Sequence, residues 1–176
     1  MSSRKRVLFF VAFAMAALLG GGWSYYCHEY PYGWSHSCDL QLISALRQYA
    51  EEHGGAFPAG GATPEASLSL LHPEYANHCV LQGKTVPLGR VQEILESGQP
   101  LGPDTCGWYY VEGLWLSDDK RLAICWDKVG LGHNGQRLPD GGHWVLFIDG
   151  QKDYIPGWKW PAFLQGQAKL LAARQK

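Results

Sequence analysis

Thiol, imidazole and carboxyl side chains gather in one stretch of the sequence: Cys125, Asp127, His133, His143 and Asp149. A Cys/His/Asp hydrolase would need its thiol and imidazole within hydrogen-bonding reach. Asp127, His133 and His143 would instead offer the nitrogen and oxygen ligands of a metal site. No local motif spacing joins these residues, so we interpret Asp127 and His133 as residues that hydrogen-bond the loop beside the last strands. The sequence thus predicts no catalytic residue and no cofactor, and metal binding by Asp127, His133 and His143 is the alternative.

Aromatic residues offer a second kind of site. Trp158 and Trp160 lie between Pro156 and Pro161. An exposed tryptophan pair would suit a glycan or another flat ligand, although clustered aromatics usually pack against the rest of a domain. A binding module that uses Trp158 and Trp160 is therefore an alternative to a purely structural role.

The cysteines suggest an oxidising compartment. The chain has five, none of them in a C-x-x-C pair, and an odd number leaves at least one unpaired. We expect a disulfide between Cys79 and Cys106 first, because it would close a long irregular loop, and between Cys27 and Cys38 next. Cys125 lies in an apolar run and is expected to be a small buried residue.

The N-terminal segment predicts export. Residues 4–6 are Arg-Lys-Arg, residues 7–19 are apolar, and an aromatic belt with Trp23 and Tyr26 follows. Up to residue 26, the segment reaches the roughly 20 residues that span a bilayer. The small-x-small sites of a signal peptide fall inside the apolar run, so we favour an uncleaved anchor over a cleaved signal peptide. The expected location is the cytoplasmic (inner) membrane, crossed once by residues 7–26, with the globular part on the extracytoplasmic side.

A helix is expected soon after this anchor. Apolar residues follow a helical spacing at Leu42, Ile43, Leu46, Tyr49 and Ala50. Ser37 or Asp39 is expected to cap its first turn, and Gly54 and Gly55 to end it.

The rest of the chain predicts a small sheet. Residues 108–111 and 122–126 resemble strands, residues 80–81 a short strand, and residues 86–96 a helix. In residues 143–155 an apolar run breaks at Asp149-Gly150, which favours a hairpin with a type I′ turn. Pro161 could begin a last helix.

These elements predict an α+β fold: an N-terminal membrane helix, then a helix packed on a small antiparallel sheet, with a C-terminal Asp-Gly hairpin and a last helix. The expected organisation is an anchor over residues 1–26, a linker over 27–37, a globular domain over 38–160 and an amphipathic helix or tail over 161–176. The formal net charge of −1 gives no basic surface for nucleic acid, so none is expected as a partner.

Two stretches after the anchor carry patterns of a known family. Residues 38–58 read CDLQLISALRQYAEEHGGAFP and residues 67–75 read SLSLLHPEY, with Cys79 shortly after. They are similar to N-L-x-x-I-x-x-A-L-x-x-Y-x-x-D-x-G-x-F-P and L-x-x-L-x-P-x-Y. The chain thus resembles bacterial type IV pilin-like and type II secretion pseudopilin-like proteins. Three later stretches follow in the order of the subgroup that ends in an H-x9-D-G signature: 108–113, 122–128 and 143–150.

The chain departs from that family in two places. It lacks the prepilin cleavage motif, a glycine followed by Phe-Thr-Leu-x-Glu before the apolar helix. His143 is too close to Asp149 for the signature, and His133 is too far unless residues 134–142 are an insertion. The resemblance therefore implies a divergent, permanently anchored pilin-like module. We expect a non-enzymatic interaction or assembly component, whose partners are the membrane and other pilin-like or secretion-system proteins.

Overall fold

The computed structural model describes residues 3–35 and 37–174. The outermost residues of the predicted anchor and of the predicted C-terminal segment lie outside this part. The described chain forms an α+β structure with an N-terminal apolar helix and a four-stranded antiparallel sheet, as the sequence predicts at this level.

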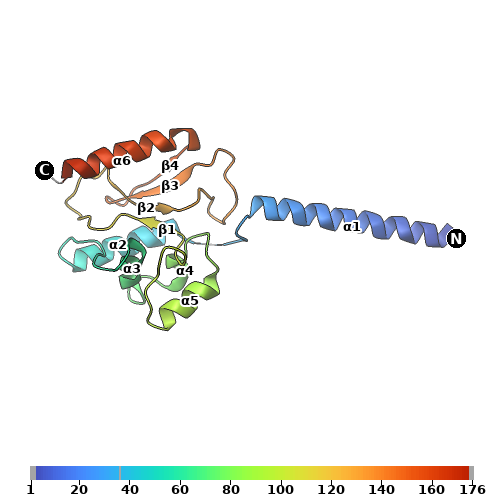
Figure 1. Cartoon of the computed structure of the whole chain (residues 1–176), viewed down its shortest axis with the longest axis horizontal. Helices are drawn as coiled ribbons and strands as arrows, with labels where there is room; N and C mark the ends of the chain where they lie inside the picture. Colours follow the sequence, from blue (N-terminus) through green and yellow to red (C-terminus); the bar gives the residue numbers. More distant parts are fainter. Residues whose placement is uncertain (1–2, 36, 175–176) are drawn as a thin grey trace.

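The N-terminal helix α1, Ser3–Glu29, projects away from the globular part (Figure 1). Its apolar side chains from residue 10 onward lie outside the core: Leu18 is 77% exposed and Trp23 is 68% exposed. By length and composition, the segment Phe10–Glu29 can cross a membrane, and none of it is buried in the rest of the chain.

Helix α2, Asp39–Glu52, places Leu42, Leu46 and Ala50 in the core, as the helical spacing predicts. The expected capping by Ser37 or Asp39 is wrong. The N-cap is Cys38, whose side chain makes no capping hydrogen bond. The Ser37 hydroxyl instead donates to the backbone carbonyls of two residues of another helix, Cys79 and Val80, at 3.3 Å each.

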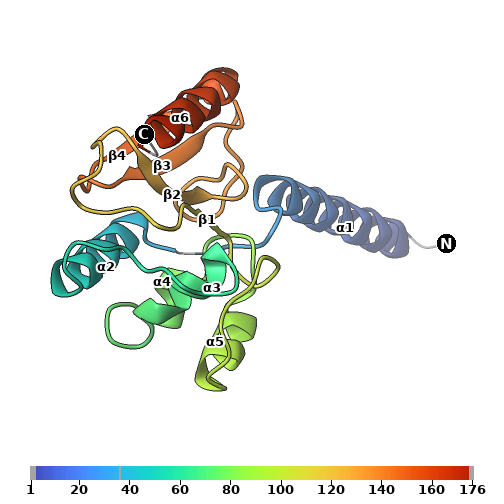
Figure 2. The same cartoon turned by 60° about the vertical axis from the view of Figure 1, so that its left-hand side comes forward.

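Short helical elements follow on the same side of the sheet as α2 (Figure 2). They are α3 (Pro64–Leu68), a 3₁₀ turn η1 (Ser69–Leu71), α4 (His78–Leu81) and α5 (Leu88–Glu96). The short strand expected at residues 80–81 is wrong, because this segment is α4. The side chain of Asn77 accepts a hydrogen bond from Val80 N at 3.1 Å and caps that helix.

The sheet has the order β1-β2-β3-β4, and every neighbouring pair is antiparallel. Its strands are β1 (Trp108–Tyr110), β2 (Ala123–Asp127), β3 (His143–Phe147) and β4 (Lys152–Ile155). Every residue of β2 is buried, because helices cover both faces of the sheet (Figure 1). A register shift between Ala123 and Cys125 lets Ala123 and Trp126 reach the same face although they are three residues apart.

Residues 148–151 connect β3 to β4, but not by the expected type I′ turn. That turn needs positive φ at both central residues, and the described chain has no residue other than glycine at positive φ. Gly150 N donates to Phe147 O at 2.9 Å, so Ile148 and Asp149 are the central residues and Gly150 follows them at φ 89°. The glycine has the expected positive φ at a different position of the turn.

The last helix, α6, spans Trp160–Arg174 after a 3₁₀ turn, η2 (Gly157–Lys159). It covers the face of the sheet opposite α2 (Figures 1 and 2). Trp160 and Phe163 pack there on the buried residues Ala123, Trp126 and Val145. The expectation of one helix on one face was therefore incomplete, and the C-terminal segment is part of the folded unit.

Candidate functional site

The most unusual polar group of the molecule is a buried charge cluster formed by Lys84, Asp39, Asp127 and Lys152. Lys84 Nζ donates to Asp39 Oδ1 at 3.0 Å and also contacts Asp127 Oδ2. Lys152 Nζ donates to the other oxygen of Asp39 at 2.5 Å. The side chains of Lys84, Asp39 and Asp127 are 0%, 2% and 1% exposed, whereas that of Lys152 is 21% exposed.

Four parts of the chain position the cluster. Asp39 is the first residue of α2, Asp127 is the last residue of β2, and Lys152 begins β4. Lys84 follows α4, and its ammonium group lies 5.2 Å from the centre of a Trp108 ring.

A close backbone approach fixes the segment that carries Lys84. Gly107 N donates to Gln82 O at 2.8 Å. Gly83 has φ 69°, and a Cβ there would lie 2.6 Å from the Gly107 Cα. Only glycine combines this φ with this contact.

The two carboxyl groups of the cluster differ in their electrostatics. Burial raises the pKa of Asp127 to about 7, although Lys84 opposes this shift. Burial also acts to raise the pKa of Asp39, but the ammonium groups of Lys84 and Lys152 outweigh it and lower that pKa. Burial acts to lower the pKa of Lys84, and the two aspartates outweigh it and raise that pKa. Among the described residues, none hydrogen-bonds Asp127 Oδ1.

A second candidate site is an aromatic pocket of about 640 Å³ between α6 and the sheet. Tyr109, half exposed, stacks on Trp126 with ring centres 4.4 Å apart. His143 stacks on Trp160 at 3.9 Å. Around these rings, the pocket is lined by a few polar side chains, namely Glu112, Lys128 and Gln167, and by apolar residues of α6.

His143 is the titratable ring of this aromatic pocket. Burial lowers its pKa, and its Nδ1 has no hydrogen-bond partner among the described residues. A neutral, stacked imidazole is suited to packing against a ligand or a tryptophan more than to holding a charge.

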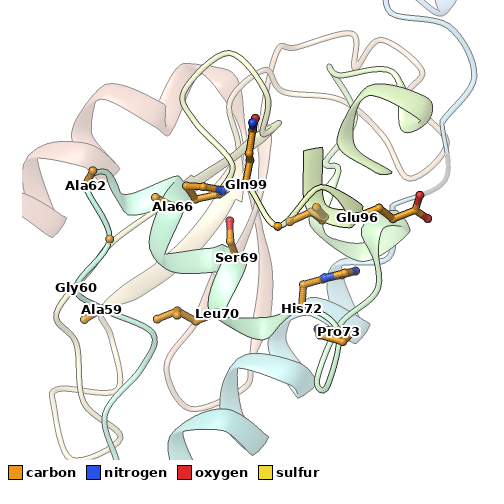
Figure 3. Close-up of a pocket in the computed structure, with 14 residues that line it drawn as sticks. Ala59, Gly60, Ala62, Ala66, Ser69, Leu70, His72, Pro73, Glu96 and Gln99 are labelled. Atoms are coloured by element: carbon orange, nitrogen blue, oxygen red, sulfur yellow. The ribbon is translucent and has the colours of Figure 1, made fainter. Parts of the chain in front are cut away.

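A third cavity, of about 660 Å³, lies between the segment that contains α3 and η1 and the end of α5 (Figure 3). Its polar residues include Ser69, His72, Glu96 and Gln99. The Ser69 hydroxyl accepts a hydrogen bond from Leu101 N at 2.8 Å and lies 3.5 Å from Glu65 O. Within the described chain no hydrogen bond joins Ser69 to His72, so this cavity has no assembled nucleophile and base.

The three residues proposed as metal ligands do not form one site. Asp127 contacts Lys84, His143 stacks on Trp160, and His133 is exposed in the loop after β2. No group of three histidine, cysteine or acidic side chains in residues 3–35 and 37–174 could hold a metal ion. The interpretation of Asp127 as a loop-binding residue is also wrong, because its hydrogen-bond partner is Lys84.

The five cysteines are free thiols. The expected Cys79–Cys106 and Cys27–Cys38 disulfides are therefore not present in the structure. Cys106 is buried, with its Sγ 3.6 Å from Leu81 O, and burial raises its pKa to about 12. Cys125 is buried as expected, and burial raises its pKa as well.

The two tryptophans of the alternative ligand platform are not equivalent. Trp158 is 75% exposed, with the Lys159 ammonium 4.7 Å from the centre of its ring. Trp160 packs between His143 and Phe163. The platform is not formed, and Trp160 lines the aromatic pocket instead.

Sequence reasoning missed the two lysines of the charge cluster, the buried Lys84 and the partly exposed Lys152, both of which contact Asp39. Asp39 was considered only as a helix cap. An isolated lysine carries no local signal of burial, since lysine is normally exposed. The preceding Gly83 was the one available hint, because glycine is common where the backbone needs a positive φ or a close approach.

Comparison with protein-family models, with curated proteins and with solved structures gives no match for this chain.

Proposed function

We propose that this chain is a membrane-tethered interaction component of the pseudopilin-like kind, with its globular domain displayed outside the cytoplasm. One observation carries the proposal: among the described residues, the apolar helix that can span a bilayer contributes no side chain to the core of the domain that follows it. Exposed apolar surface on that scale calls for a lipid or helix partner.

The sequence resemblance supports the pilin-like part of the proposal. The stretch that carries the family pattern forms α2, and α2 packs against an antiparallel sheet. The missing cleavage motif favours a tethered component over a filament subunit. Such a component would contact its partners through the lateral surface of α1 within the membrane.

A non-catalytic role fits the chemistry of the candidate sites. Both buried thiols have raised pKa values, so they are poor nucleophiles. The Ser69 hydroxyl hydrogen-bonds backbone and not a base. Neither arrangement provides an activated nucleophile.

The membrane part of the proposal is tested by charge substitution in α1. Phe13→Arg together with Leu18→Arg places two charges in the apolar span, which costs several kcal/mol in lipid. We expect this variant to lose membrane association, while the wild type resists extraction by alkaline carbonate. The matched control, Leu88→Arg with Leu164→Arg, changes two exposed leucines outside α1 and should remain in the membrane. Equal extraction of all three proteins would contradict the proposal.

The partner is tested by photo-crosslinking in membranes of the native host. A photoreactive residue at Leu18 should form an adduct with a second polypeptide that has an N-terminal apolar helix, either another copy or another pilin-like protein. The same residue at Gln165, exposed on α6, should not give that adduct. Adducts with lipid alone at Leu18 would argue against an assembly component and leave a simple anchor.

The aromatic pocket favours a second function, binding of a glycan. Flat sugar faces pack on Trp and Tyr rings, and this pocket offers Tyr109, Trp126 and Trp160 beside polar side chains. With β-1,4-linked hexosamine oligomers, we expect quenching or enhancement of tryptophan fluorescence. Tyr109→Ala should weaken binding at least about tenfold, equivalent to about 1.4 kcal/mol. Trp158 lies outside the pocket, so Trp158→Ala should leave the affinity unchanged. A larger loss of affinity for Trp158→Ala than for Tyr109→Ala would instead place the ligand on Trp158.

A further inference from the structure

The amine of Lys84 lies between two carboxyl groups in a site closed to solvent. It contacts Asp127 Oδ2 on one side and is 3.0 Å from Asp39 Oδ1 on the other. The three side chains are at most 2% exposed. Such confinement holds the amine beside the Asp127 carboxyl group, and a fixed close approach of two groups favours a reaction between them.

We propose that Lys84 and Asp127 join in an intramolecular isopeptide bond, with Asp39 as the carboxylate that moves the protons. The bond would form within the folded chain and needs no cofactor. This inference is independent of the proposed membrane-associated function.

The two aspartates are suited to different roles in this reaction. Amide formation needs a neutral carboxylic acid as the electrophile, and burial raises the pKa of Asp127 to about 7. It also needs an ionised carboxylate within reach of the ammonium proton, and Asp39, which stays ionised beside two ammonium groups, accepts a hydrogen bond from Lys84 Nζ at 3.0 Å. Asp127 Oδ1 has no hydrogen-bond donor among the described residues, so the hydrogen bond that favours the charged form of this carboxyl group is the one from Lys84 to Oδ2.

The atoms of the step balance. Asp39 takes one proton from the Lys84 ammonium, and the neutral amine attacks Cγ of the protonated Asp127. The Nζ–Cγ bond forms, and the bond between Cγ and one carboxyl oxygen breaks. That oxygen leaves as water with the carboxyl hydrogen of Asp127 and one further hydrogen of the Lys84 amine. Asp39 is left protonated, and no oxidant or reductant is consumed.

Lys152 is not the amine of this bond. Among the described residues, the carboxylate that Lys152 contacts is Asp39, which two ammonium groups hold in the ionised form. An ionised carboxylate is a poor electrophile. Lys152 is also partly exposed, so water competes for its amine. Its ammonium group helps to keep Asp39 in the ionised form.

The bond would connect two regions that are distant in the sequence. Lys84 and Asp127 are separated by 43 positions, and they join the segment after α4 to the end of β2. A covalent link there would hold the helical layer to the sheet even when the core loosens.

Peptide mapping of the full chain, purified in detergent, tests the proposal. We expect a branched tryptic peptide that contains both Lys84 and Asp127 and is lighter by one water than its two parts. Trypsin should not cleave after Lys84 in this species. Separate linear peptides with an unmodified Lys84 and Asp127 would overturn the proposal.

A second reaction causes the same loss of one water and must be distinguished from the isopeptide bond. Asp140-Gly141 and Asp149-Gly150 can each form a succinimide with the same mass change. A succinimide is opened by hydroxylamine, whereas an isopeptide bond is not. A water loss that maps to either Asp-Gly pair and disappears in hydroxylamine, with Lys84 and Asp127 unmodified, would overturn the proposal.

Two variants assign the role of Asp39. Asp39→Asn keeps both reacting residues but removes the proton acceptor, and we expect the branched peptide to be lost. Asp119→Asn removes an exposed carboxylate paired with Arg121 and should leave the branched peptide intact. Persistence of the branched peptide in Asp39→Asn would overturn the role of Asp39. The wild-type map decides whether the bond exists even if Asp39→Asn fails to fold.

Discussion

On one face of the sheet, Ile124 and Leu146 pack with α2 into a large aliphatic core that also encloses the Lys84 cluster. On the other face, Ala123, Trp126 and Val145 meet a small aromatic cluster beneath α6, and an open pocket remains beside it. The polar groups on the first face are charged and buried. The second has polar groups, such as Glu112 and Lys128, at the edge of a cavity. The difference indicates that one face holds the fold together, while the other leaves surface available for a ligand.

The largest expected effect on stability is on the face of the sheet that carries the Lys84 cluster. Lys84→Ala leaves two aspartates buried without their shared ammonium group, and loss of one partner of a buried pair costs about 3–5 kcal/mol. The urea midpoint should fall accordingly, whether Lys84 is held by ion pairs or by a covalent bond. Arg121→Ala, which breaks an exposed pair, should leave the midpoint unchanged. Similar midpoints for Lys84→Ala and the wild type would mean that the cluster does not hold this face.

The second largest effect on stability is expected in the turn between β3 and β4. Gly150 has φ 89°, where a β-branched residue is strained, so Gly150→Val should destabilise by about 1–3 kcal/mol. Gly150→Asn should be milder, because asparagine tolerates positive φ. Both added side chains first meet the end of the flexible Arg47, so backbone strain should decide the difference. Equal urea midpoints for the two variants would show that the positive φ is not required.

The hydrogen bonds that attach α6 to the sheet should contribute less to the free energy of unfolding than the Lys84 cluster does. Gln167 accepts a hydrogen bond from Ala123 N at 2.9 Å and donates to Arg121 O at 3.0 Å. Gln167→Leu leaves these backbone groups without partners, and we expect a loss of about 1–2 kcal/mol in the free energy of unfolding. The control, Gln165→Leu on the exposed side of α6, should be neutral. A loss as large as that for Lys84→Ala would remove the contrast between the two faces.

The smallest expected effect is a pH dependence of stability that comes from His143. Burial lowers the pKa of His143, so the folded state disfavours its protonated form. Its contribution to stability is therefore complete above the unfolded pKa of about 6.5 and is lost as the pH falls through the folded value. Urea midpoints at pH 7.5 and pH 5 should differ more for the wild type than for His143→Phe. The same pH dependence in both proteins would show that the stacked imidazole does not titrate on this face.

Local patterns were sufficient for much of the fold. The spacing of Leu42, Leu46 and Ala50 predicted α2, and apolar β-rich runs predicted β1 and β2. These features depend on neighbours within a few residues of one another, which a sequence displays directly. The type I′ turn was wrong because the Asp-Gly signal fixes where a glycine is needed and leaves the turn geometry to the pairing of the strands.

Neighbouring residues along the chain were enough to predict the apolar helix α1, the amphipathic helix α2 and a positive φ at Gly150, because each of these depends on local chemistry. The tertiary structure alone decided which charges are buried. Asp39, Lys84, Asp127 and Lys152 come from separate segments, and only the packing of α2 and the α4 segment against the sheet removes them from water. Burial changes the proton affinity of a carboxyl group far more than any neighbour in the sequence does. For this reason the pKa of Asp127, and with it the proposed bond to Lys84, depends on the folded chain.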